Sequence, residues 1–536
     1  MSPKFTPRPL VGIALTFIAG AILAEQTVAP LPLLLALAAF AILFHLLVRT
    51  RRGLESFRRL APVLLYLATF AIAWATAGMQ TRSPSARAIE IGTLPPPSRL
   101  VLIADVTGEA RGTELWYGGR MRWTLPARVI AISRDRGKSW ARSRGQATLT
   151  WYAPHKIEPP GVGERWMIAA EARSQSYIPY RGRPSDSPSI QSRADESLRL
   201  SNAHGLRLVR HCLAGRQAAS RILSTGIERN RDVIAILHSL LLGLRQEMPR
   251  ELRSLFANTG TFHIFAISGL HVGIFAGVVI LALSISRVPR GYWFACLAPI
   301  LIAYTISTGA RPSAVRACVM AIIYFMAPLF QRRSDAVSAV SASAIALLAW
   351  NSSQVRDLGF IFSFSVVLGL IILYPICAAP LTRLVERDPF RVRAESRPIQ
   401  WLRSSGRYIT SLLAASCAAW LTSAPLMAFY FERFAPIALP GNLAAIPLTF
   451  LIVFTGCLSL LFGSWIPLVA DIFNHANLAL ANALIGSIRL LSTIPGSHMK
   501  VAPIPLWSLV AWYAVLLLGA FRWHARRLRA VGTGEQ

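Results

Sequence analysis

The sequence predicts a polytopic α-helical membrane protein, with about twelve transmembrane helices and a small β-barrel domain inserted between them. Three observations carry this prediction. Hydrophobic residues make up 54% of the 536-residue chain, whereas only 15% of its residues are charged, well below the fraction typical of soluble domains. The apolar residues fall into separate segments of a length that crosses a bilayer. A long stretch of short, β-rich runs separates the third segment from the fourth.

The apolar segments lie in two blocks, and a spanning helix needs about 20 residues. They are 10–25, 29–48, 60–79, 262–283, 291–308, 313–330, 335–350, 358–379, 408–430, 437–464, 467–491 and 504–523. The first is not expected to be a cleaved signal peptide, because two more follow it at once. We therefore expect N-terminal transmembrane helices over 1–80 and a second transmembrane domain over 259–525.

Arginine in the connecting loops predicts the orientation, because cytoplasmic loops carry an excess of basic residues. Lys4 and Arg8 precede the first segment, and residues 49–59 carry five arginines. Residues 380–407 carry seven more, and the arginines between Arg522 and Arg529 lead into and through the tail at 526–536. All of these are predicted to lie in the cytoplasm. Both termini are then cytoplasmic, and the β-rich stretch is extracytoplasmic.

The stretch over 81–205 predicts a small extracytoplasmic β domain. Glycine and polar residues bound its β-rich runs, as in a small barrel or sandwich. The expected strands are 99–106, 121–132, 146–152 and 165–172. Residues 176–205 are polar and rich in serine and arginine, so a loose excursion is expected there. Arginines spaced among apolar residues favour amphipathic helices on the membrane surface over 206–258.

Basic and aromatic residues alternate within this predicted β domain. The net charge of the chain is +31, and only four of its 56 basic residues are lysines, so the excess is arginine, which suits phosphate. Binders of single-stranded nucleic acid combine such cations with aromatic rings that stack on bases. The candidate contacts are Arg120, Arg122, Trp123, Arg136, Lys138 and Trp140. The alternative is a solvated basic face whose tryptophans belong to a small core.

Motifs of common enzymes are absent from the sequence. No His-x-His-x-Asp-His, His-Glu-x-x-His or Cys-x-x-Cys pattern provides a metal site. Gly137-Lys138-Ser139 ends like a phosphate-binding loop, but position 132 is isoleucine where that motif requires glycine. Cys212 is the one cysteine outside the predicted membrane segments, so no disulfide is expected in the β domain. We expect no metal, no cofactor and no enzymatic activity.

The start of the second membrane block carries polar residues that are costly in lipid and are therefore functional candidates. His263, Ser268 and His271 stand there together. Glycine repeats every four residues from Gly269 to Gly277, which predicts a face for close helix packing. A hydrolase using Ser268 with a histidine base is an alternative, but no carboxylate nearby orients either histidine.

Three further segments of this block carry candidates. Arg316 either reaches the membrane interface or faces the bundle interior, where its charge suits a passing phosphate. Asp357 is expected to cap the helix that follows it, or to pair with Arg311 or Arg316. Prolines, a glycine and Asn442 interrupt the segment at 439–447, which predicts a broken helix that lines a cavity.

Together, and in this order, these segments resemble the ComEC family of competence proteins, the inner-membrane DNA-uptake channels of naturally transformable bacteria. The resemblance covers about 235–510 and rests on 263–272, 309–320, 357–364 and 440–447. It implies that one DNA strand passes through the bundle into the cytoplasm, and that the β domain is OB-like. The motif positions that carry over to the DNA path are His263, Ser268, Gly269, His271, Arg311, Arg316, Asp357 and Asn442.

The resemblance also implies partners. These are single-stranded DNA, membrane lipids, a DNA receptor outside and a separate motor or nuclease, with the oligomeric state left open. Many family members end in a β-lactamase-like metal-hydrolase domain whose motif is missing here, so a form without that domain is expected. Two alternatives to a channel are the membrane-embedded hydrolase with Ser268 and His271, and a structural relative that does not import DNA.

Overall fold

The computed structural model describes residues 9–27, 31–50, 61–82, 98–108, 110–114, 120–135, 137–154, 157–172, 189–201, 207–265, 269–385, 396–494 and 499–532. The described chain forms two compact units. One contains the six-stranded sheet with the second and third helices (α2 and α3), and the other contains most of the later helices. The first loops that predicted the orientation, and Arg136 and Ser268, lie outside the described residues.

A described helix occupies each of the twelve predicted membrane segments. These helices are α1 (Pro9–Gln26), α2 (Leu31–Thr50), α3 (Ala61–Arg82), α7 (Gly269–Ile285), α8 (Trp293–Ser307), α9 (Pro312–Met326), α10 (Ala336–Trp350), α11 (Leu358–Arg383), α12 (Arg397–Phe431), α13 (Ala438–Gly463), α14 (Pro467–Ser492) and α15 (Leu506–Gly532). Seven helices among the described residues are long and apolar enough to cross a membrane, and four more are apolar but shorter. The chain is therefore a multi-pass membrane protein, but the count of about twelve spans is not confirmed.

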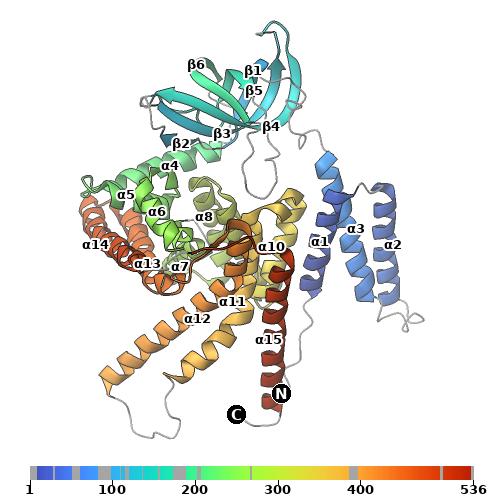
Figure 1. Cartoon of the computed structure of the whole chain (residues 1–536), viewed down its shortest axis with the longest axis vertical. Helices are drawn as coiled ribbons and strands as arrows, with labels where there is room; N and C mark the ends of the chain where they lie inside the picture. The colour runs from blue at the N-terminus through green and yellow to red at the C-terminus, as the bar shows by residue number, and fades with distance from the viewer. Residues whose placement is uncertain are drawn as a thin grey trace. The chain divides into compact units, whose positions relative to one another are not determined.

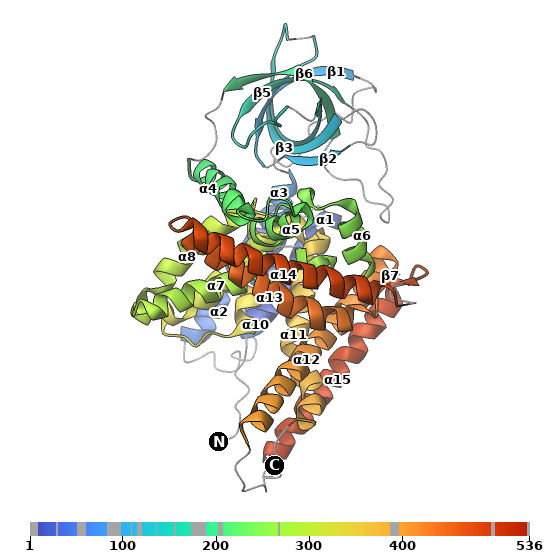
Figure 2. The same ribbon diagram turned by 90° about the vertical axis from the view of Figure 1, so that its left-hand side faces the viewer.

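Two short strands, β7 (Arg433–Phe434) and β8 (Met499–Lys500), pair with each other, and the other described strands form a small closed barrel. They are β1 (Ser98–Val106), β2 (Arg111–Glu114), β3 (Arg120–Ser133), β4 (Ala141–Pro154), β5 (Arg165–Ala172) and β6 (Ser189–Ser201). Their order is β1-β5-β6-β4-β3-β2, and β1 also pairs with β3, which closes five of the strands into the ring seen in Figure 2. The β4–β6 pair is parallel, whereas the other pairs in this sheet are antiparallel. A closed five-stranded barrel is the architecture shared by OB folds.

Inward-facing apolar side chains fill the barrel because alternate residues of a strand point to the same face. The fully buried members include Leu102 of β1, Leu125 of β3, Trp151 of β4 and Ile168 of β5. Trp151 satisfies its indole N–H by donating to Ser197 Oγ of β6 at 3.0 Å. The barrel is thus a packed core and not a pore.

The loose excursion predicted for 176–205 is wrong over the described part, because residues 189–201 form β6. This strand has few apolar residues, and Ile190 is its fully buried one. Backbone hydrogen bonds to both β4 and β5 hold this strand in the sheet. Such pairing leaves no alternation of apolar residues in the sequence, so the strand was not predicted. Residues 173–188 lie outside the described residues.

The helical unit contains a group of long helices and a set of short ones. In both views α11, α12 and α15 lie side by side (Figures 1 and 2), and contacts join all three pairs. α13 packs against α14, and α14 contacts two short helices, α5 (Arg231–Leu237) and α6 (Arg250–Asn258). Together with α4 (Arg207–Ser224), these short helices occupy the range predicted for interfacial helices.

The broken helix predicted at 439–447 is wrong, because α13 continues without interruption from Ala438 to Gly463. Pro440 lies in the first turn, where the backbone N–H groups have no partner within the helix and proline is tolerated. Gly441 lies at a close contact, since a Cβ atom placed on it would be 3.0 Å from Thr261 Cγ2. Pro447 is the one proline inside the helix proper.

Candidate channel site

A buried arginine lies at the junction of α9 and α11. The side chain of Arg316 is 5% exposed, and its Nη1 lies 3.3 Å from Oδ1 of Asp357. Arg316 therefore faces the bundle interior and does not reach outward. The same carboxylate oxygen accepts a hydrogen bond from the backbone N–H of Phe360 at 2.7 Å, which caps α11. Both expectations for Asp357 are confirmed, and its ionic partner is Arg316 and not Arg311.

Gly359 leaves the space that this ion pair needs. A Cβ atom at position 359 would lie 2.8 Å from Arg316 Nη2 and 2.9 Å from Asp357 Oδ1. Any side chain there would displace the guanidinium or the carboxylate. Sequence reasoning did not single out Gly359, although a glycine in the first turn after an aspartate cap is a signal of close approach.

A second polar group gathers at the start of α7. His271 is fully buried. Arg245 is held by a hydrogen bond from its Nε to the carbonyl oxygen of Phe265 at 2.5 Å. His263 lies in a 3-10 turn, Phe262–Phe265, with Nδ1 2.9 Å from the carbonyl oxygen of Gly260. Arg245 was not predicted, because it lies in a short turn before the recognised motif.

Asn442 belongs to the region around this second group. The start of α13 packs on the residues just before His263, where Gly260 adopts a φ of 70° and approaches Ala435 and Ala438. Asn442 is buried, and its Oδ1 has no hydrogen-bond partner among the described residues. Helix α7 packs against both α9 and α13, and α9 packs against α11, so all four motif segments meet in one bundle.

The packing face predicted from Gly269, Gly273 and Gly277 is wrong within the described chain. A Cβ atom on any of the three would meet no described atom within 4 Å. The face of α7 that does pack carries His271, Val272, Ile274 and Ala276. The glycine repeat therefore marks the open side of this helix.

Residues 240–526, just over half of the chain, match the family described as Competence protein. The chain belongs to the competence protein family. The ComE operon protein 3 of Bacillus subtilis (strain 168) is similar to this competence protein, with 27% identity over 279 residues. That match covers 49% of this chain and 32% of the relative, so the chain spans about a third of the relative's length. No solved structure matches it.

One hydrogen-bonded set in this competence protein was not anticipated. His238 Nδ1 lies 2.6 Å from Glu247 Oε2, and its Nε2 lies 3.4 Å from Ser224 Oγ. The residue types are those of a nucleophile, a base and an orienting acid. However, Ser224 is at the C-terminal end of α4, and the backbone N–H groups of residues 225–227 already donate within this turn. These N–H groups are therefore not available to stabilise an oxyanion next to Ser224. We interpret the hydrogen-bonded set of Ser224, His238 and Glu247 as structural.

The candidate DNA contacts of the barrel fall into two groups. Lys138 and Trp140, which is 40% exposed, lie at the β3–β4 hairpin. Arg122 is also exposed, but it lies near the other end of β3. Ten residues separate it from Ile132, next to the hairpin, which corresponds to about 33 Å along the strand. Trp123 packs against the barrel core, as the alternative interpretation expected for the tryptophans. Arg120 is part of β3.

The hairpin that carries Lys138 and Trp140 is held by Asp135. Its carboxylate accepts hydrogen bonds from the Ser133 hydroxyl at 2.7 Å and the Ser139 backbone N–H at 2.9 Å, and also from the Ser139 hydroxyl. These bonds, the Ser139 hydroxyl first among them, lower the pKa of Asp135 below its usual range. Among the described residues, no three His, Cys, Asp or Glu side chains are arranged to hold a metal ion.

Proposed function

We propose that this competence protein is an inner-membrane channel that passes single-stranded DNA into the cytoplasm during natural transformation. The observation that supports it most is Arg316, a buried cation inside the helix bundle, within the part of the chain that matches the family. A phosphate in a medium of low dielectric constant needs such a fixed cation. The counterion Asp357 is 47% exposed, so a phosphate can replace it on the guanidinium.

The second polar group supplies further contacts on this proposed path. Arg245 bonds to the turn that holds His263, His271 is buried in the first turn of α7, and Asn442 is buried in α13, which packs on both segments. The path then includes the motif positions His263, Ser268, Gly269, His271, Arg311, Arg316, Asp357 and Asn442, with Arg245 added. The open side of α7 carries no side chain at Gly269, Gly273 and Gly277.

The β barrel is the proposed extracytoplasmic contact for incoming DNA. In this arrangement both termini are cytoplasmic, and Lys138 and Trp140 offer a phosphate contact and a stacking ring on one rigid hairpin. A receptor outside the cell delivers the DNA strand. A separate polypeptide acts as the motor that drives transport or as the nuclease that degrades the other strand. A reporter fused at residue 150 should report an extracytoplasmic position, and a cytoplasmic signal would contradict the orientation.

DNA uptake tests the channel itself. Deleting the gene should abolish internalisation of labelled DNA, and the wild-type gene should restore it. Arg316→Ala should fail to restore uptake at a normal level of membrane protein, whereas Arg332→Ala, an exposed loop arginine, should restore it. Arg316→Lys should restore it in part, because lysine keeps the charge but not the bidentate geometry. Normal uptake in the deletion strain would instead support a relative that does not transport DNA.

Binding of DNA tests the barrel. The variant with both Lys138→Ala and Trp140→Ala should bind single-stranded DNA more weakly, with a salt dependence reduced by about 0.7 in log–log slope for the lost charge. Arg128→Ala is the matched control, since this basic residue is exposed in the middle of β3. An equal loss in the control would show that net charge, and not the hairpin, governs binding.

A further inference from the structure

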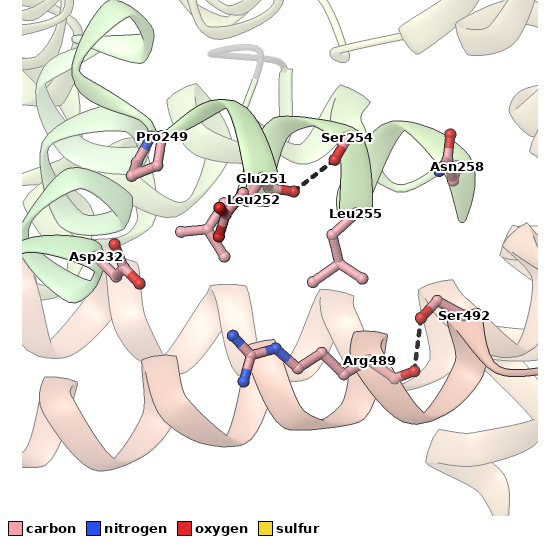
Figure 3. A pocket seen from close by; sticks show the side chains of 9 residues that line it. All are labelled: Asp232, Pro249, Glu251, Leu252, Ser254, Leu255, Asn258, Arg489 and Ser492. Carbon is pink, nitrogen blue, oxygen red and sulfur yellow. Dashed lines mark hydrogen bonds between the residues drawn. The ribbon is translucent and has the colours of Figure 1, made fainter.

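A pocket of about 390 Å³ lies between the short helix α6 and the C-terminal part of α14. This volume is within the range of small-ligand sites. Figure 3 shows its walls: Glu251, Leu252 and Leu255 project from α6 on one side, Asp232 stands at one end, and Arg489 of α14 extends along the other side. The pocket is separate from the polar groups assigned to the DNA path.

The charges around this pocket are opposite in sign but do not neutralise one another. Among the described residues, Arg489 forms no ion pair within 4.0 Å with Asp232 or Glu251, although all three line the same space. In Figure 3 the guanidinium of Arg489 points toward the Asp232 end of the pocket. The pocket therefore holds one cation and two carboxylates, all on exposed residues, with room between them.

This pattern of charge selects the ligand. A polyanion such as DNA is repelled by the two carboxylates, and a simple cation leaves Arg489 without an anionic partner. A zwitterion with a phosphate and a primary ammonium satisfies both sides, because guanidinium binds phosphate bidentately and an ammonium donates up to three hydrogen bonds to carboxylates. Leu252 and Leu255 add an apolar wall that suits the glycerol and acyl part of a lipid.

We propose that this pocket binds the headgroup of a zwitterionic phospholipid with a primary amine, of the phosphoethanolamine type. The phosphate lies on Arg489, and the ammonium lies between Asp232 and Glu251. The site would tie α6 and α14 to the surrounding bilayer through a specific lipid. It does not depend on DNA transport.

The test uses the full chain purified in detergent and titrated with short-chain lipids, with bound lipid read by native mass spectrometry. Phosphatidylethanolamine should bind at least tenfold more tightly than phosphatidylglycerol, which lacks the ammonium, and than phosphatidylcholine, whose quaternary ammonium donates no N–H hydrogen bond. Equal binding of the three lipids would overturn the proposal. Soluble glycerophosphoethanolamine binding as tightly as the lipid would show a site for free zwitterions instead.

Two variants separate the two halves of the site. Arg489→Ala should weaken binding of phosphatidylethanolamine and phosphatidylglycerol alike, whereas Glu251→Gln should remove only the preference for the ethanolamine lipid. Arg383→Ala, in the last turn of α11, and Glu228→Gln are exposed matched controls and should bind like the wild type. A preference that survives both Arg489→Ala and Glu251→Gln would refute the assignment of these side chains.

Discussion

Replacing Asp357 separates the two roles of this carboxylate. Asp357→Asn removes the charge opposite Arg316 but keeps an oxygen that can accept from the N–H of Phe360, because asparagine is as good a cap as aspartate. Asp357→Ala removes both the charge and the cap. The two variants therefore differ by the hydrogen bonds to this oxygen, which in the wild type come from the N–H of Phe360 at 2.7 Å and from Arg316 Nη1 at 3.3 Å.

The expected costs follow from the burial of the two partners. A fully buried pair loses about 3–5 kcal/mol when one partner is removed, and an exposed pair about 0.2–1 kcal/mol. Arg316 is buried but Asp357 is half-exposed, so water screens the carboxylate and Asp357→Asn should cost about 1–2 kcal/mol. Loss of the cap should add about 1 kcal/mol in Asp357→Ala.

The measurement is equilibrium unfolding of the purified full chain in mixed micelles, followed by tryptophan fluorescence. Arg316→Met completes a double-mutant cycle with Asp357→Asn, and the coupling between them should be about 1 kcal/mol. Equal destabilisation by Asp357→Asn and Asp357→Ala would refute the capping role. Strict additivity of Arg316→Met and Asp357→Asn would refute the ion pair.

Three further predictions concern other contacts. Gly359→Ala should destabilise the same unfolding transition by about 1–3 kcal/mol, because its Cβ would displace the ion pair; a neutral result would show that the pair moves freely. Asn474→Ala should cost about 3 kcal/mol in that assay, since it removes two hydrogen bonds to backbone carbonyls of residues 222 and 225 and one from Ser459. The lowered pKa of Asp135 means that its contribution to the hairpin is full at neutral pH and is lost only as pH falls below the ordinary range of a carboxyl group. Trp140 fluorescence should report that loss in acid, and Asp135→Asn should abolish the dependence on pH.

The positions of the helices could be predicted from the sequence, because apolar runs of spanning length are a local signal. The number of spans could not, since several apolar helices prove too short by themselves. Local apolar patterning does not predict β6, in which Ile190 is the fully buried apolar residue. Backbone pairing with β4 and β5 holds this strand in the sheet. Pro440 was wrongly interpreted as a break in the helix. Proline interrupts a helix only beyond the first turn, and Pro440 lies within the first turn of α13.

The candidate site shows the same division. The motif segments were identified correctly as a group, and the structure brings them into one bundle. Whether Arg316 faces outward or inward depends on the neighbour that α9 meets, which no pattern within α9 states. The glycines from Gly269 to Gly277 have the spacing of a packing face, but spacing does not reveal whether another helix lies opposite.

Closure of the β barrel has a consequence for how this domain recognises anything. A strand edge with free N–H and C=O groups invites another chain to add to the sheet. In the barrel, β1 pairs on both sides, and among the described strands the short β2 leaves its outer side unpaired. Apart from the outer side of β2, a partner that approaches the paired strands therefore meets side chains and loops and not an open strand edge.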